Sequence, residues 1–229
     1  MTAPIEVAGG VWVTLTTADR ATASTHRDDR RRAAALPEWR AREFLAGRGL
    51  LRQLLAAVAL GPAGAEIVPD RRGKPWLHGH PDLGISISHS RGTLAAGVAL
   101  GRAVGVDVQR PDPAVRASFA RRLLGTHAGR LTALPPAVAA EEVAWVWTVQ
   151  EACVKAAGPG LAGRPWTIDV PPGARSGRWR GYRWRSLRDH SSTPLSCAFA
   201  LIADAPDPPT VLPGTPARTS RPTPWKGAR

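Results

Sequence analysis

The sequence predicts an α+β fold. Short segments in which apolar and polar residues alternate, as they do along a strand, are separated by isolated long stretches with the apolar spacing of a helix. The chain contains no exact internal repeat. With 229 residues it is long enough for one large domain or two small ones, and in either case it can bury a sizeable core.

The first sixty residues predict a strand followed by a long helix. Residues 11–16, VWVTLT, alternate as a strand does. A basic segment, 27–32, comes before Pro37, which stands where a helix favours proline in its first turn. Through residues 39–60 the residues Phe, Leu and Val recur at helical spacing, and Gly61-Pro62 closes the helix.

The next fifty residues predict mainly strands. Residues 67–79 are expected to form a short strand, a turn and another extended piece. In ISISHS, 85–90, the isoleucines face one way and the serines the other, and 94–100 predicts a buried neighbouring strand. In AVGVDVQ the valines share one face, so Asp107 and Gln109 point together to the opposite face.

The last part of the chain predicts a second long helix and further strands. Residues 111–135 indicate a loop with a short helix, and a long helix starts near Glu141 and ends at Gly158-Pro159-Gly160. The strands are expected around 166–170, 178–186 and 195–202. Residues 205–229 contain seven prolines and little apolar content, which predicts a disordered tail.

The composition narrows the class of protein without naming a function. The formal net charge of +13, from 31 basic and 18 acidic residues, predicts attraction to a polyanion but does not distinguish nucleic acid, lipid, cofactor or acidic protein. Two cysteines are too few for a disulfide scaffold. The chain shows neither a signal peptide pattern nor an apolar run that could span a membrane, so we expect a cytoplasmic protein that does not enter a membrane.

Four short segments carry the strongest functional signal. They are GKPWL at 73–77, SISHS at 86–90, GVDVQ at 105–109 and WTVQEACVKAAGPGL at 147–161. Together, in this order and spacing, they resemble the motifs of the 4′-phosphopantetheinyl transferases of the surfactin-synthetase type, over about residues 38–165. This class, which includes the holo-acyl-carrier-protein synthases, moves the phosphopantetheine arm of coenzyme A onto a serine of a carrier protein and releases 3′,5′-ADP.

The residues themselves fit chemistry on a diphosphate. Such a reaction needs a hard cation held by oxygen ligands, together with basic groups that neutralise the leaving charge. Asp107 and Gln109 lie two residues apart on one strand face, about 7 Å apart at Cα, so their side chains can converge on one ion. Glu151 would arrive from the second long helix.

The resemblance implies a role for each of these residues. It places Mg²⁺, with Mn²⁺ as the alternative, on Asp107, Gln109 and Glu151. It makes Glu151 and Lys155 catalytic, with Glu151 acting on the serine hydroxyl as a base or through a water. It implies contacts to coenzyme A from Arg48, Lys74, Ser88, His89, Gln150 and Lys155.

The resemblance also implies an architecture and a partner. The fold would be two similar α+β halves in a pseudo-twofold arrangement, residues 1–102 and 103–204, with the metal site in the second half and coenzyme A in the cleft between them. A monomer would suffice. The partner would be an acidic acyl or peptidyl carrier protein of fatty acid, polyketide or nonribosomal peptide biosynthesis, and neither a membrane nor nucleic acid is expected to bind.

Two positions depart from the pattern of the family. Gln109 replaces the usual Glu, which keeps an oxygen ligand but removes a negative charge and should weaken metal binding. Gln150 replaces the usual Lys, which removes a cation that would neutralise phosphate. An active enzyme with altered affinities is the simplest outcome, and a non-catalytic relative of the transferases is the alternative.

Each residue also has a purely structural explanation. Glu151 and Lys155 are four residues apart, which is the spacing of an ordinary ion pair along a helix. Asp107 could be a carboxylate at a strand end that caps a loop. His89 could be a surface or hydrogen-bonded core histidine.

The sequence is also compatible with other functions. RWRGYRWR, 178–185, interleaves aromatic residues with arginines and suggests a nucleic-acid-binding protein, although Gly181 would equally permit a hairpin turn there. A metal-dependent hydrolase using His78 and His80, and a pure interaction module, are the remaining possibilities.

Overall fold

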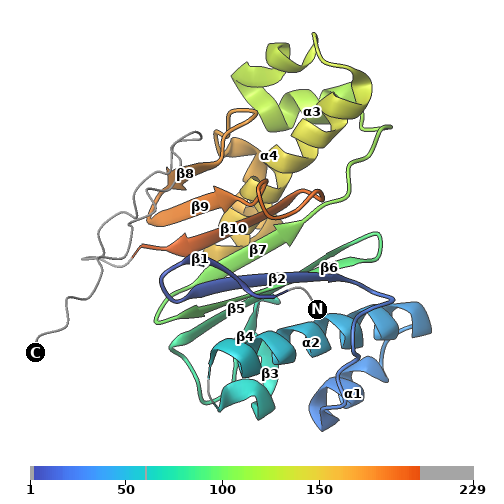
Figure 1. The fold of residues 1–229 in the computed structure, drawn as a ribbon, viewed down its shortest axis with the longest axis vertical. Helices are drawn as coiled ribbons and strands as arrows, with labels where there is room; N and C mark the ends of the chain where they lie inside the picture. The colour runs from blue at the N-terminus through green and yellow to red at the C-terminus, as the bar shows by residue number, and fades with distance from the viewer. Residues whose placement is uncertain (1–2, 60, 202–229) are drawn as a thin grey trace, which may run out of the picture.

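The computed structural model describes residues 3–59 and 61–201 and is an α+β protein, as predicted (Figure 1). Two four-stranded antiparallel sheets form its centre. The first has the order β1-β2-β6-β5, with β1 Ile5–Ala8, β2 Val11–Thr17, β5 Leu83–Ser90 and β6 Thr93–Leu100. The second has the order β7-β10-β9-β8, with β7 Val104–Val108, β8 Ser176–Trp179, β9 Tyr182–Ser186 and β10 Leu195–Ala200.

The remaining elements surround these sheets. A small hairpin pairs β3, Ile67–Pro69, with β4, Pro75–Leu77. The α-helices are α1 Arg27–Ala33, α2 Glu38–Val58, α3 Ala117–Leu124 and α4 Pro136–Ala157. Short 3₁₀ turns lie at Pro62–Gly64, Gly125–Leu131, Gly160–Gly163 and Pro165–Thr167. No helix within 3–59 or 61–201 is long and apolar enough to cross a membrane.

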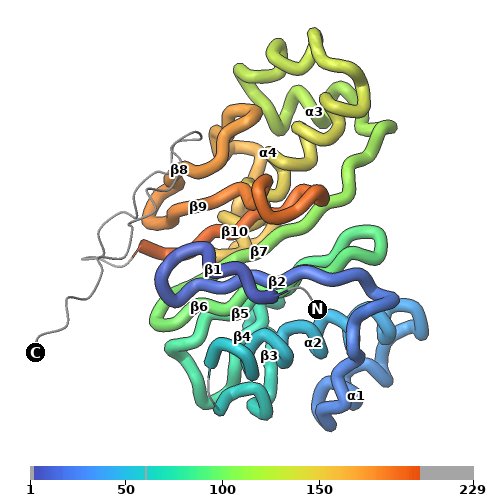
Figure 2. Tube along the Cα trace, in the orientation of Figure 1, coloured from blue at the N-terminus to red at the C-terminus, as the bar shows by residue number. Residues whose placement is uncertain are grey.

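The elements stack in layers, with α2 at one end of the molecule, α4 toward the other and the two sheets between them (Figure 2). One apolar cluster, including Leu51 and Ile85, lies between α2 and the first sheet, and another, including Val149 and Trp184, lies between α4 and the second sheet. A third cluster joins the two sheets, where Val11 and Val106 belong to the same core. The position of α4 is therefore fixed relative to the first sheet through three buried layers.

The two sheets follow the same chain order. In the first, β2 precedes the long helix α2, and the strands that follow lie in the order β2-β6-β5. In the second, β7 precedes the long helix α4, and the order is β7-β10-β9. Below, the N-terminal half denotes the described residues up to 102 and the C-terminal half those from 103.

Serine hydroxyls link the two halves beside β7. The serine face of β5, predicted from its alternation, lies against β7, and each hydroxyl accepts a hydrogen bond from a backbone N–H. The pairs are Ser86 with Val106 at 2.9 Å, Ser88 with Val108 at 3.3 Å and Ser90 with Arg110 at 3.0 Å. These side chains replace the backbone pairing that neighbouring strands would otherwise make, so the register of β7 on β5 is set by the spacing of the serines.

Two sequence predictions for the C-terminal half need correction. The strand expected at 166–170 is wrong, because Pro165–Thr167 forms a 3₁₀ turn whose proline suits a first helical position. The second long helix starts at Pro136 rather than near Glu141, again with proline in the first turn. The tail predicted to be disordered, 205–229, lies outside the described residues.

The RWRGYRWR segment forms a hairpin. Of the two interpretations of this segment, the hairpin turn is therefore confirmed. The chain turns at Arg180-Gly181, where Arg180 has φ of 52°, between β8 and β9. This turn lets both tryptophans pack inward, because Trp184 is buried and Trp179 packs against the same apolar cluster. Trp179 also stacks on Tyr182, with ring centroids 6.1 Å apart. Packing within the fold therefore accounts for these aromatic residues.

Gly105 permits the close approach of β7 to α4. A Cβ at this position would lie far inside contact distance of the Ala152 carbonyl oxygen and the Ala156 nitrogen, which are backbone atoms and cannot turn aside. We expect Gly105→Ala to lower the free energy of unfolding by about 3 kcal/mol, measured by chemical denaturation.

Gly97→Ala is the matched control for this prediction, because its nearest neighbour would be the Val106 Cβ at 3.4 Å. We expect a change within about 1 kcal/mol for this variant. Equal effects of the two substitutions would contradict the proposed close packing at Gly105.

Candidate functional site

Asp107 is the centre of a buried polar cluster between the halves. It lies on β7, with 5% of its surface exposed. Its Oδ1 accepts hydrogen bonds from Lys155 Nζ at 2.6 Å and from Ser88 Oγ at 2.6 Å. Lys155 Nζ also donates to Ser88 Oγ at 3.0 Å. The cluster thus joins β5, β7 and α4, and the strand-end cap considered for Asp107 does not describe its contacts.

Glu151 lies next to this cluster on α4. Burial, together with the nearby Asp107 carboxylate and against the opposing effect of Lys155, raises the pKa of the Glu151 carboxyl to about 7. Its Oε1 is buried and has no hydrogen-bond partner among the residues that the structure describes. A buried carboxylate oxygen without a donor, beside a second carboxylate, is a feature that a bound cation would satisfy.

Lys155 forms its ion pair with a residue of another element and not with a residue of its own helix. Its ion pair is with Asp107 on β7, and its Nζ also donates to the Val106 carbonyl at 3.3 Å. The ordinary helix pair of Glu151 with Lys155, considered from their spacing, is therefore not the main contact of this lysine. The lysine therefore ties α4 to β7.

The raised pKa of Glu151 predicts a pH-dependent stability. Because the folded-state pKa, about 7, lies above the usual 4.5, the folded protein binds more protons than the unfolded chain between these values, and this contribution to stability is lost as pH rises through them. In the presence of a chelator, we expect Glu151→Gln to become progressively more stable relative to the wild type from about pH 4.5 to 7. Denaturation curves across this range measure the difference, and a difference independent of pH would contradict the raised pKa.

A small cavity opens beside Lys155 at the junction of the halves. Its volume is about 180 Å³, and residues from both halves line it, including Ser86 from β5 and Lys155 from α4. A larger cavity of about 670 Å³ lies against α2. The two cavities share three lining residues: Gly73, Pro75 and Ile87. The two cavities therefore adjoin, and Lys155 connects the smaller one to the polar cluster.

Arg48 lines the larger cavity from α2. It is buried, its guanidinium lies 5.0 Å from the centre of the Phe44 ring, and Asp29 Oδ1 is 4.0 Å from its Nε. Burial lowers the pKa of Arg48 to about 10, although the Asp29 carboxylate raises it. Its Nη1 is buried and has no hydrogen-bond partner within the described part of the chain. Such a group is suited to an anionic ligand in the cavity.

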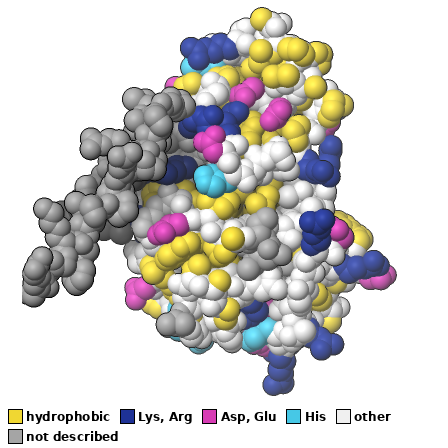
Figure 3. Space-filling view, in the orientation of Figure 1, with side chains coloured by type: hydrophobic (Ala, Val, Ile, Leu, Met, Phe, Trp, Pro, Cys, Tyr) yellow, Lys and Arg dark blue, Asp and Glu magenta, His cyan; other side chains and the backbone are white. Residues whose placement is uncertain are grey.

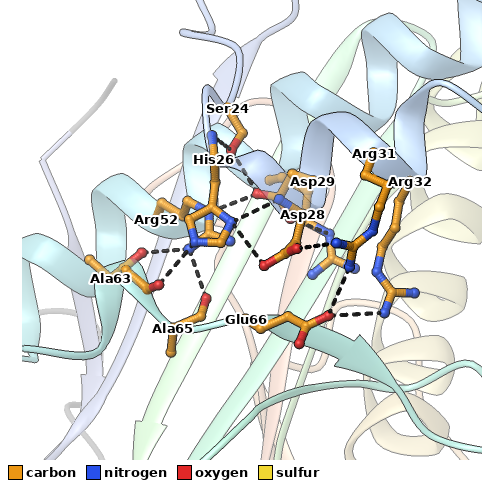
Figure 4. Close-up of polar contacts among 12 residues, drawn as sticks. Ser24, His26, Asp28, Asp29, Arg31, Arg32, Arg52, Ala63, Ala65 and Glu66 are labelled. Carbon is orange, nitrogen blue, oxygen red and sulfur yellow. Dashed lines mark hydrogen bonds and ion pairs between the residues drawn. The ribbon is translucent and has the colours of Figure 1, made fainter.

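The segment before α2 forms a wall of the larger cavity and is fixed by buried charges (Figure 4). Asp29 is fully buried and accepts hydrogen bonds from Ser24 Oγ at 2.6 Å and Arg52 Nε at 2.7 Å. Arg52 also donates to the Ala63 carbonyl at 2.5 Å. Sequence reasoning treated 27–32 only as a basic segment and missed Asp29, whose only signal was an acidic pair inside a run of arginines.

His89 lies on the rim of the larger cavity. Its side chain is 54% exposed, and its Nδ1 lies 3.0 Å from Glu43 Oε1 on α2. Sequence analysis did not identify Glu43. It also missed Arg32 and Arg40, which line the same cavity and make its rim more basic.

Lys74 lies near the polar cluster but already has a partner. It follows the turn of the β3–β4 hairpin and lines the small cavity. Its Nζ donates to the Ala156 carbonyl at the end of α4, at 2.5 Å. Burial lowers the pKa of this lysine, partly opposed by Asp70.

Both glutamines that depart from the family pattern donate hydrogen bonds to backbone carbonyls. Gln109 follows β7, and its Nε2 donates to the neighbouring Arg110 carbonyl at 3.1 Å. Gln150 is fully buried, and its Nε2 donates to the carbonyls of Leu123 and Ile168, each at 2.9 Å. Gln150 therefore lies in the core of the C-terminal half and not at the cavity. In the core it links α4 to the chain at Leu123 and at Ile168.

The basic side chains are not gathered into a single patch on the face of the molecule shown in Figure 3, where they are spread among acidic and apolar ones. On this face the distribution differs from the continuous basic stripe that favours nucleic acid. Arg48 and Lys155 are among the residues that line the cavities.

These features define an α+β protein with two joined sheets, in which basic side chains line two adjoining cavities and one of them, Lys155, pairs with the buried carboxylate of Asp107. Such cavities suit a phosphorylated ligand. Comparison with known families gives a specific match. Residues 103–198, which carry Asp107, Glu151 and Lys155, match the model of the 4′-phosphopantetheinyl transferase superfamily, and the resemblance predicted from the sequence is confirmed at that level.

Two curated proteins are similar to the chain. It is 32% identical over 132 residues to the 4′-phosphopantetheinyl transferase HetI of Nostoc sp., covering 55% of each chain. It is 29% identical over 123 residues to a 4′-phosphopantetheinyl transferase of Bacillus subtilis, covering 53% of this chain and 54% of that protein. The chain thus matches about half the length of these relatives.

Proposed function

We propose that this protein transfers the 4′-phosphopantetheine group of coenzyme A to a serine of a carrier protein and releases 3′,5′-ADP. The observation that carries the proposal is the buried Glu151 oxygen, which lacks a hydrogen-bond partner in the described chain and lies beside Asp107 and Lys155. These three residues fall in the segment that matches the superfamily. The names of the similar proteins support the same reaction.

Coenzyme A would lie across the two adjoining cavities. Its diphosphate would lie by the small cavity, where Lys155 and Ser86 are available, and its nucleotide end would lie in the larger cavity. Arg48 and His89 line that larger cavity and would face the anionic nucleotide. Ser88 would act through Asp107, because its hydroxyl is committed to that carboxylate.

Asp107 and Glu151 fit a divalent cation, and we propose Mg²⁺, with Mn²⁺ as the alternative. Their carboxylate oxygens are the ligand type that hard cations prefer, and the unpartnered oxygen of Glu151 supports this assignment. The described residues contain no group of three or more His, Cys, Asp or Glu side chains arranged for a metal, so further ligands would come from water, coenzyme A or Gln109. When bound, the cation neutralises charge on the diphosphate.

Two side chains of the protein would then act in the reaction, one by accepting a proton and the other by stabilising charge on the phosphates. Glu151 would accept the proton of the attacking serine hydroxyl, directly or through a water, since its raised pKa suits a base near neutral pH. The serine oxygen forms a bond to the phosphorus that carries pantetheine, and the bond to the bridging oxygen breaks, so that 3′,5′-ADP leaves. Lys155 would stabilise the charge that develops on the phosphates.

The carrier protein would approach a positively charged enzyme. The net charge of +13 would favour an acidic acyl or peptidyl carrier protein through long-range attraction, which predicts an apparent affinity that weakens with salt. We further propose that the halves 1–102 and 103–204 are related by a pseudo-twofold axis, on the basis of their repeated strand order. A monomer in the cytoplasm, of the surfactin-synthetase type, is part of the same proposal.

The experiment that tests this function combines the protein with coenzyme A, Mg²⁺ and a panel of apo carrier proteins. Intact mass spectrometry then follows the carriers. We expect at least one carrier to gain the mass of a single phosphopantetheine group, and no gain when a chelator replaces Mg²⁺. Coenzyme A binding without any mass gain would indicate a non-catalytic relative, and salt-sensitive binding to random oligonucleotides without coenzyme A binding would favour a nucleic-acid-binding protein.

A further inference from the structure

Lys74 connects the two halves at a point distant in sequence from its partner. Its side chain reaches from the β3–β4 hairpin of the N-terminal half to the Ala156 carbonyl of α4, with Nζ 2.5 Å from the oxygen. Lys74 Cδ also lies 3.8 Å from the position that a Cβ on Gly158 would occupy. The lysine therefore approaches the end of α4 with its Cδ and donates a charged hydrogen bond to it.

The partner of Lys74 is a group that a helix leaves without an internal bond. The last four carbonyls of an α-helix have no intrahelical donor, and together they carry the negative end of the helix dipole. At the end of α4, the Val154 carbonyl accepts from the Gly158 N–H at 2.9 Å. Lys74 supplies the donor for Ala156, two residues further on. Its positive charge is also the sign that stabilises a helix C-terminus.

The turn of α4 that Lys74 binds is the turn that carries Lys155. Lys155 immediately precedes Ala156, and its Nζ reaches Asp107 at 2.6 Å. Gly105 lies against the same turn, because its Cβ position would meet Ala152 and Ala156 backbone atoms. The end of α4 is thus held from the C-terminal half by β7 and from the N-terminal half by Lys74.

We propose that Lys74 is a positioning residue that fastens the last turn of α4 to the N-terminal half and thereby holds Lys155 against Asp107. This role differs from the contact with coenzyme A that the sequence resemblance implied for Lys74. The ammonium already has a partner in the free protein, where the side chain is partly buried. The link to catalysis depends on the proposed transferase function, whereas the fastening of α4 does not.

The first test uses the free protein, without coenzyme A or metal. We expect Lys74→Met to increase amide hydrogen exchange in the last turn of α4 by about 10-fold, because it removes a charged hydrogen bond to that turn. Arg71→Met is the matched control, since it removes the same charge from an exposed position of the same hairpin. Lys74→Arg keeps a charged donor and should therefore restore slow exchange. This result would show that the faster exchange of Lys74→Met does not come from a general loss of folding.

The second test separates positioning from ligand binding. With coenzyme A saturating, we expect the kcat for transfer by Lys74→Met to fall about 10-fold, because Lys155 is no longer held in place. A simple contact to coenzyme A would instead raise the KM for coenzyme A, leave kcat unchanged and leave exchange of the free protein unchanged, and this combination would overturn the proposal. An inactive wild type would contradict the transferase function alone, because the exchange measurement would still decide the role of Lys74.

Discussion

Asp107→Asn should reduce transfer of phosphopantetheine by about 10³-fold in kcat/KM. The substitution keeps the shape of the side chain and an oxygen that can accept from Ser88, but it removes the negative charge that pairs with Lys155. It also removes one of the two carboxylates that would hold the cation. Rates measured by carrier mass over time, at several Mg²⁺ concentrations, give the size of the effect.

Asp189→Asn provides the control for Asp107→Asn. Asp189 lies in the same half, and its side chain is 69% exposed and pairs with Arg175 at the surface. We expect the activity of this variant to stay within about 2-fold of the wild type, because an exposed ion pair contributes little. Retention of more than a tenth of the wild-type activity by a folded Asp107→Asn protein would show that this carboxylate is not part of the reaction site.

Glu151→Gln should reduce kcat by about 10³-fold. The amide has nearly the same volume as the carboxyl group, so packing in α4 should survive, but it can neither accept the serine proton nor offer a charged oxygen to a cation. The substitution also relieves the repulsion from Asp107, which helps to raise the pKa of Glu151. The variant should therefore fold at least as well as the wild type at neutral pH while losing activity.

Glu142→Gln controls for loss of a carboxylate elsewhere on the same helix. Glu142 pairs with Arg188, with Nη1 2.6 Å from Oε1, far along α4 from the cluster. We expect this change to affect the denaturation midpoint more than the turnover of the folded enzyme. If Glu151→Gln turned over at a similar rate to Glu142→Gln, Glu151 would be excluded as the base.

Much of the central fold could be predicted from local pattern. Alternation at 11–16, 85–90 and 103–109 predicted β2, β5 and β7, because each of these strands has one face in an apolar core. Helical spacing predicted α2, whose apolar side chains pack on the first sheet. Gly158, in a left-handed conformation with φ of 92°, ends α4 as expected.

Long-range contacts could not be predicted in this way. The pairing of Lys155 with Asp107 depends on α4 lying across β7, whereas the sequence spacing suggested Glu151 as the partner. The serines of β5 were expected to share a face, but nothing local indicated that β7 would donate its backbone N–H groups to them. The 3₁₀ turn at Pro165–Thr167 was predicted as a strand because apolar residues near prolines fit both structures.

The two glutamines show that a residue's position in a motif does not by itself predict whether its side chain reaches the candidate site. Gln150 stands next to Glu151 in sequence, yet adjacent residues on a helix point in different directions, and Gln150 points into the core. Gln109 follows the end of β7, and its amide donates a hydrogen bond to the neighbouring Arg110 carbonyl. The cations at the cavities in the structure are therefore those of α2, α4 and the hairpin.

The most direct measurement is anomalous scattering from crystals grown with Mn²⁺ and coenzyme A. A single Mn²⁺ peak should lie between the carboxylates of Asp107 and Glu151 and touch the coenzyme diphosphate. Ordered coenzyme in the two cavities with the manganese bound elsewhere, or with the diphosphate remote from both carboxylates, would contradict the proposed site.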